Sequence, residues 1–167
     1  MSGRLRVFLI CVVLFSTACG RHTSDADLKL IFNRHEEQFQ RLLAMVQTDG
    51  AGKTIGPRYI RQSRLHYGET EHQDLSEERW KQYQDLLSEL GVEGVATDGS
   101  SASFRVDSPS IQNGDSDKGF FYSETPPEPS FADLDGYKIS PSTRTKHGDY
   151  LAYRQIRPNW YLYIHYN

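Results

Sequence analysis

Cysteine is scarce in this chain of 167 residues, which contains only Cys11 and Cys19. A dense disulfide framework, which stabilises many small secreted domains, is therefore excluded. Long apolar runs are scarce as well, since the longest, at 7–15, is about half the length of a membrane-spanning helix. The chain has no basic excess either. Its net charge is −3, which makes nucleic acid an unfavourable partner.

The short apolar run has the surroundings of a secretory signal peptide. Arg4 and Arg6 precede it, small residues at 16–18 lead from it to Cys19, and the chain then turns polar. This order resembles the lipobox of bacterial lipoproteins, although Ser16 stands where that family usually has leucine. The resemblance implies a small lipoprotein of Gram-negative bacteria. In that family the cysteine carries a diacylglycerol, and after cleavage its new amino group carries a fatty acid such as palmitate.

The resemblance implies three parts of the chain, of which cleavage before Cys19 would remove the first. These are a signal peptide at 1–18, a lipidated tether at 19–24 and a single domain at 25–167. Cys11 would leave with the signal peptide and lipid would occupy Cys19, so we expect core packing to stabilise the domain without a disulfide. In this family a residue other than Asp after the cysteine, here Gly20, implies transport to the outer membrane. We therefore expect a lipid-anchored protein of the outer membrane that faces the periplasm.

Two helices are predicted at the start of the domain. Ser24 and Asp27 form a variant of the capping box, and apolar residues then recur at three- and four-residue spacing over about 25–48. A second helix begins after Ser76, a good N-cap, and ends at Gly91, which fits the left-handed position after a helix.

The rest of the chain is typical of antiparallel strands. Asp98-Gly99 separates two short extended runs, as a hairpin turn does, and Pro158-Asn159 separates 150–156 from 160–166 in the same way. A short aromatic strand is predicted at 119–123. We therefore predict an α+β domain, with two N-terminal helices packed on one face of a small antiparallel sheet of about four strands.

Two short motifs suggest bound ions, but each lacks a necessary part. Gly52-Lys53-Thr54 resembles the end of a phosphate-binding loop, yet Gln47 stands where the motif needs a glycine. The segment 113–124 has oxygen-bearing side chains at the spacing of a calcium loop, yet Lys118 replaces the glycine that the sharp turn requires. We expect a plain turn and a solvated loop at these segments, and no cofactor or metal.

Signals for catalysis are weak. The segment 66–72 contains two histidines and two glutamates, which are zinc-ligand types, but their spacing is typical of an exposed loop. His35 lies on the apolar stripe of the first helix, where a boundary histidine, a pH sensor and a catalytic group are all open interpretations. Asp133 and Asp135 alternate along an extended segment, and no Gly-x-Ser-x-Gly motif is present. We expect no enzymatic activity.

The richest feature is the aromatic C-terminus. Alternation along a strand sends Trp160, Leu162 and Ile164 to one face, where they fit a core under the helices. It sends Tyr161, Tyr163 and His165 to the other face. This second set is a candidate partner-binding face for an envelope protein or a glycan. Cross-strand packing of tyrosines that only stabilises the sheet is the alternative.

These observations favour a non-enzymatic binding module, held to the membrane by lipid on Cys19. One alternative is an immunity or inhibitor lipoprotein that protects the envelope against a toxin or a lytic enzyme. A small envelope hydrolase is the other.

Overall fold

The computed structural model describes residues 22–49, 53–56, 59–62, 75–107, 110–111, 114–137 and 149–166. Three helices occur in this part of the chain: α1 (Asp25–Arg34), α2 (Glu36–Asp49) and α3 (Glu77–Leu90). The strands described are β1 (Lys53–Gly56), β2 (Tyr59–Gln62), β3 (Gly94–Thr97), β4 (Ser101–Asp107), β5 (Ser110–Ile111), β6 (Gly114–Ser123), β7 (Tyr150–Arg157) and β8 (Trp160–Tyr166). None of the described helices is both long and apolar enough to cross a membrane.

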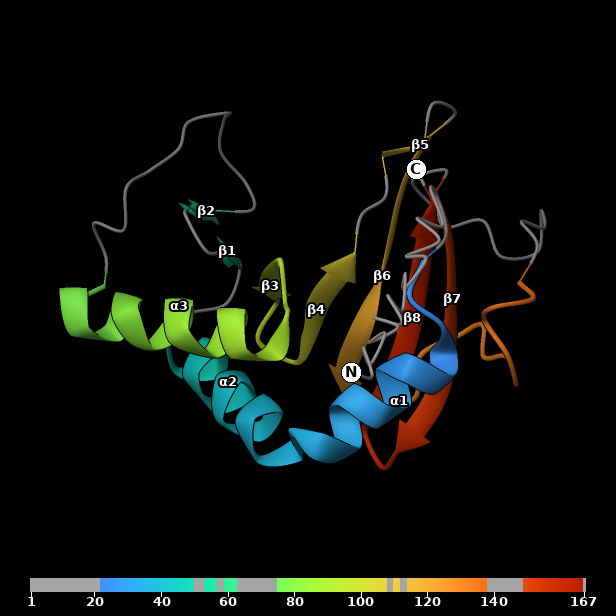
Figure 1. Cartoon of the computed structure of the whole chain (residues 1–167), viewed down its shortest axis with the longest axis horizontal. Helices are drawn as coiled ribbons and strands as arrows, with labels where there is room; N and C mark the ends of the chain where they lie inside the picture. Colours follow the sequence, from blue (N-terminus) through green and yellow to red (C-terminus); the bar gives the residue numbers. More distant parts are fainter. Residues whose placement is uncertain are drawn as a thin grey trace, which may run out of the picture.

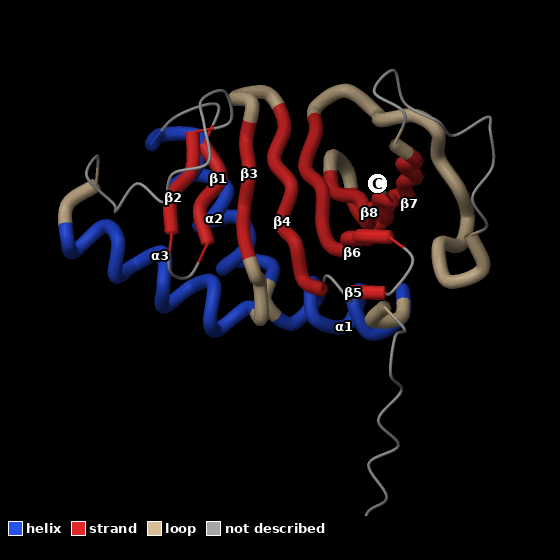
Figure 2. Tube along the Cα trace, turned by 90° about the horizontal axis from the view of Figure 1, so that it is seen from above, coloured by secondary structure: helices blue, strands red, loops and turns tan. Residues whose placement is uncertain are grey.

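The strands form one antiparallel sheet in the order β2-β1-β3-β4-β6-β8-β7, and β5 pairs with β6 beside this path. Figure 1 shows the helices along one side of the sheet, and Figure 2 looks onto β3 and β4 from the opposite side, with the helices beneath. The prediction of an α+β domain with helices on one face of an antiparallel sheet is confirmed. The sheet is larger than the expected four strands, because β1 and β2 add an antiparallel pair at one edge and β5 pairs with β6. β6 is also twice as long as the aromatic segment 119–123.

The helix ends follow from local side-chain chemistry. The Ser24 hydroxyl accepts a hydrogen bond from the Asp27 amide at 3.1 Å, and Ser76 accepts one from the Arg79 amide at 3.2 Å. Gly91 closes α3 with φ of +64°, a left-handed conformation that glycine adopts without strain. These three predicted ends are confirmed.

The helix expected at 25–48 is interrupted at His35. The amide of this residue still donates to the carbonyls of Ile31 and Phe32, but its ψ of 26° ends α1, and α2 starts at the next residue. The break changes the direction of the chain (Figure 1). Phe32 and Phe39 on either side of the break stack with ring centroids 5.4 Å apart. The apolar stripe continues through the break, so the sequence pattern gives no sign of it.

The core lies between the helices and the sheet, and its centre is aromatic. Trp160 packs 4.9 Å from Phe32, and Phe39 packs 4.6 Å from Phe120, measured between ring centroids. The predicted core positions Trp160, Leu162 and Ile164 are all buried. Gly119 brings β4 and β6 together, because a Cβ at this position would lie 2.0 Å from the Phe104 carbonyl oxygen.

The outer edge of β7 is covered near its middle by the loop that follows β6. Ser130 forms an isolated parallel bridge with Tyr153. The Tyr153 amide donates to the Pro129 carbonyl at 3.0 Å, and the Phe131 amide donates to the Tyr153 carbonyl at 2.7 Å. The loop therefore satisfies backbone groups that an edge strand would otherwise expose.

Candidate functional site

The predicted binding face is only partly accessible. Tyr161 and Tyr163 lie on the sheet face opposite the helices, as the alternation predicts, but their side chains are only 3% and 7% exposed. They are buried against Tyr153, Phe121 and Leu151, with Tyr153 paired to Tyr163 and Phe121 paired to Tyr161 across strands. For these two tyrosines the burial agrees with the alternative of cross-strand packing, and His165 is the member of the candidate set that remains partly exposed.

A line of charged side chains crosses the sheet beside this tyrosine cluster. Its members are Glu93, Arg105, Asp117, His165 and Asp149, and we call them the charged row. The Arg105 guanidinium lies 3.7 Å from Glu93 and 3.9 Å from Asp117. The His165 ring lies 3.9 Å from Asp117 and 3.7 Å from Asp149. Positive and negative groups therefore alternate along the row.

The row changes the titration of His165, one of its members, and of the neighbouring Tyr163. The Asp117 carboxylate raises the pKa of His165 above its ordinary value, against the opposite effect of burial, and Asp149 adds to the increase. Burial raises the pKa of Tyr163, and the charge of Asp117 acts in the same direction. His165 therefore carries a positive charge over a wider pH range than a free imidazole does.

A second polar cluster is buried on the helix side of the sheet. We call Asp25, Lys118, Arg154 and Asp135 the buried ion network. The Lys118 ammonium lies 2.8 Å from Asp25 and 2.6 Å from Asp135, and Arg154 donates to Asp25 at 2.7 Å. Asp25 and Lys118 are each about 1% exposed. The network joins the first turn of α1 to β6, β7 and the loop before residue 137.

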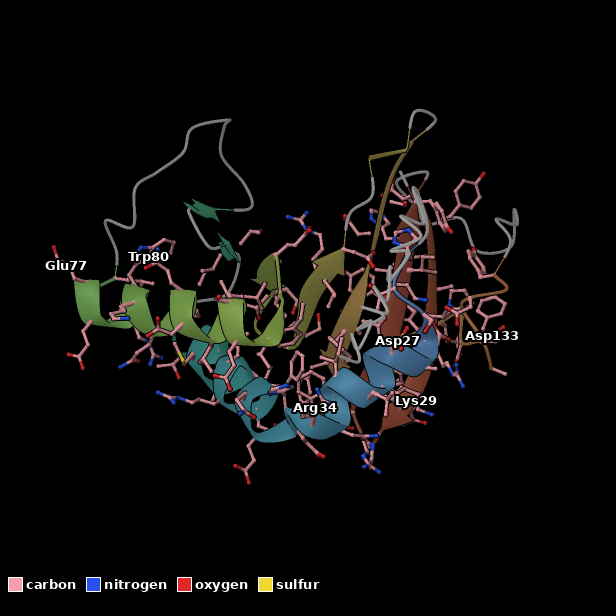
Figure 3. All side chains as sticks on the ribbon, in the orientation of Figure 1. Asp27, Lys29, Arg34, Glu77, Trp80 and Asp133 are labelled. Carbon is pink, nitrogen blue, oxygen red and sulfur yellow. The ribbon has the colours of Figure 1, made fainter. Side chains whose placement is uncertain are left out.

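The charge of Asp25 is favoured in this setting. Burial alone would raise the pKa of its carboxyl, but hydrogen bonds from Lys118, the Leu134 amide and Arg154 outweigh that effect and hold the pKa below its ordinary value. Oxygens of Asp25, Asp133 and Asp135 lie within 4.8 Å of one another, at the end of the molecule where Figure 3 labels Asp27 and Asp133. Lys118 and Arg154 balance the charges of Asp25 and Asp135, so we assign the buried ion network a structural role.

Other candidates from the sequence are placed away from both clusters or outside the described residues. Lys53 and Thr54 belong to β1, so they form part of a strand where a turn was expected. Most of the calcium-loop segment is the extended strand β6, which excludes the loop geometry that calcium requires. His35 is a boundary residue, 4.0 Å from Glu89 of α3. Cys19, Gly52 and the segment 66–72 lie outside the described residues.

The sequence analysis missed the buried ion network, although one signal was present. Lys118 lies two residues before the core residue Phe120 in the same strand. Residues two apart in a strand point to the same face, so the Lys118 side chain points toward the helices. Asp25 stands three residues before Leu28, on the buried face of α1. A lysine and an aspartate that both point into a core predict a buried pair.

Comparisons with protein families, with curated proteins and with solved structures gave no match to this chain.

We expect Asp25→Ala to destabilise the domain strongly, because it leaves Lys118 and Arg154 without their shared carboxylate. Loss of one partner from a buried ion pair costs about 3–5 kcal/mol. Urea unfolding at pH 7 measures the change. Asp27→Ala is the matched control, since Asp27 lies in the same helical turn but is exposed and accepts from Ser24. Equal destabilisation by both substitutions would contradict the structural role of the network.

We expect the pKa of His165, measured by NMR titration of its ring, to be higher in the folded protein than in the unfolded chain. Asp117→Asn should lower it more than Asp149→Asn does, because Asp117 makes the largest contribution. A raised folded-state pKa means that the stabilisation contributed by protonated His165 is fully present below about pH 6.5 and is lost as pH rises through the folded-state pKa. An unchanged His165 pKa in Asp117→Asn would refute this electrostatic assignment.

Proposed function

We propose that this protein is a lipoprotein of the outer membrane, anchored by lipid on Cys19, and that its domain binds a basic segment of another envelope protein. The charged row is the binding surface in this proposal. The observation that carries it is that the row combines unbalanced negative charge with partial exposure, on the sheet face opposite the helices.

The chemistry of the row suits a lysine- or arginine-rich segment. Three carboxylates face one guanidinium and one imidazole, so negative charge remains even when His165 is protonated. The side chains of Glu93 and Asp149 at its two ends are 51% and 38% exposed. The contacts within the row are 3.7–3.9 Å long, and partly exposed ion pairs of this kind contribute only about 0–1 kcal/mol each. The row can therefore exchange internal contacts for contacts with a partner at little cost.

The buried tyrosine cluster lies on the same sheet face as the row and packs beside it. Tyr163 is buried directly beside Asp117 and Arg105, whose charges act on its hydroxyl. Backbone pairing fixes Asp117 opposite His165. A surface that is held in place loses little conformational freedom when a partner binds, which favours recognition.

The proposed anchor predicts a specific chemical form of the protein. Intact mass spectrometry of the membrane-extracted protein should find a chain that begins at Cys19 and carries a diacylglycerol and an additional fatty acid. Cys19→Ala should abolish the modification, whereas the control Cys11→Ser should leave it unchanged, because Cys11 lies in the predicted signal peptide. An unmodified Cys19 in a soluble periplasmic fraction would overturn the anchor.

The row predicts where a partner is captured in cells. A photo-crosslinking residue at Ser103, which lies on the open face of β4 beside the row, should capture an envelope protein through a basic segment. The same residue at Leu30, which is 62% exposed on α1, is the control and should capture it several-fold less. Glu93→Lys should reduce capture at Ser103 and make the remainder less sensitive to salt, because one carboxylate has been reversed.

Capture that is equal at Leu30, or unchanged in Glu93→Lys, would refute binding through the row. The identity of the captured protein also separates the two binding hypotheses. A secreted toxin or a lytic enzyme would assign an inhibitory role to the same surface, and a resident envelope protein would assign a scaffolding role.

A further inference from the structure

His22 and Thr23, the first described residues after Cys19, are bound to one end of the sheet. The His22 ring contacts the Asp107 carboxylate through Nδ1 and lies 2.9 Å from the Ser116 hydroxyl through Nε2. The Thr23 amide donates to the second oxygen of Asp107 at 2.6 Å. We call these four residues the N-terminal latch.

Two further sets of contacts hold the latch in place. The side chain of His22 is only 11% exposed, and its ring meets the ring of Tyr166 edge-on at a centroid distance of 6.4 Å. The amide of Asp25, three residues later, donates to the Asp135 carboxylate, and the Asp25 side chain belongs to the buried ion network. The segment 22–25 is therefore fixed to the domain at both ends.

The distance from the latch to the proposed lipid is short. Only Gly20 and Arg21 separate Cys19 from His22, so the chain between them reaches about 11 Å at most. If Cys19 carries lipid, as proposed above, the latch must lie close to the bilayer surface.

The strand register shows which part of the domain surrounds the latch. Ser116 pairs with Tyr166, and Tyr166 pairs with Tyr150, so the end of β8 and the start of β7 lie beside it. Figure 1 shows this end of the strands at the top, where β8 finishes. The turn between β3 and β4 lies at the other end of β4, about 20 Å from Asp107 at the usual rise per strand residue.

The side chains at this end suit the interface between lipid and water. Tyr150, Tyr166 and Tyr137 are all partly exposed there, and the rings of Tyr137 and Tyr166 lie 6.2 Å apart. Tyrosine is enriched at membrane–water interfaces because its ring is apolar and its hydroxyl is polar.

We infer that the latch end of the sheet faces the bilayer, and that the N-terminal latch holds the domain in this one orientation. The inference rests on the proposed lipid anchor. The occupant of the surface is the interfacial region of the bilayer, and the turn between β3 and β4 points away from it.

The orientation is tested with the protein extracted from membranes and reconstituted in phosphatidylcholine vesicles. A photo-crosslinking residue is placed at Tyr150 near the latch or at Ser100 in the β3–β4 turn, and adducts with lipid are counted by mass spectrometry. We expect several-fold more lipid adduct at Tyr150 than at Ser100. Equal adduct formation at the two positions would overturn the inference.

The latch itself is tested by Asp107→Ala, which removes both the His22 and the Thr23 contacts. We expect the difference between Tyr150 and Ser100 to shrink several-fold, because a longer free tether lets the domain rotate. His22→Ala serves the same purpose if Asp107→Ala fails to fold. A difference that persists in both folded variants would contradict the role of the latch.

The same sample separates this inference from the proposed anchor. Its intact mass reports whether Cys19 is lipidated, and a missing lipid counts against the proposed function alone. Coupling a maleimide lipid to Cys19 then restores an anchor, so that the orientation can still be measured.

Discussion

The buried carboxylate of Asp25 is the constraint on which the arrangement of the elements depends. It joins the first turn of α1 to β6 through Lys118 and to β7 through Arg154. The Leu134 amide joins it to the loop that follows β6. An ionised group in an apolar interior is tolerated only while its partners stay in place, so these elements cannot shift independently. The N-terminal latch begins three residues before Asp25, so the position of the latch depends on this junction as well.

Features that depend on neighbouring residues could be predicted from the sequence. The caps at Ser24, Ser76 and Gly91, and the alternation along 160–166, each follow from a few adjacent side chains. The charged row could not be predicted, because its members meet only when four strand pairings have the right register. The burial of Tyr161 and Tyr163 likewise depends on neighbours from β6 and β7. His35 marks a break that local pattern cannot show, since both helices present apolar faces to one core.

The two faces of the same strands contribute to the two proposals separately, one face to the N-terminal latch and the other to the charged row. Ser116 points to the latch, whereas its neighbour Asp117 belongs to the charged row. Tyr166 lies beside His22, and its neighbour His165 points to the opposite face. Strand alternation thus places an anchoring contact and a binding contact within one residue of each other. In the proposed orientation the row lies close to the bilayer, so its partner has to present a basic segment near the membrane surface.

The covered edge of β7 has a consequence for a protein that is crowded on a surface. Anchoring to a membrane confines copies of a chain to two dimensions, which raises the rate at which their sheet edges meet. An uncovered edge strand would then act as a template on which a second copy could add its own strand. The bridge between Ser130 and Tyr153 occupies backbone hydrogen-bonding groups near the middle of the outer edge of β7. This short stretch of loop therefore protects the chain against sheet-to-sheet association at the local concentrations that the proposed anchor would create.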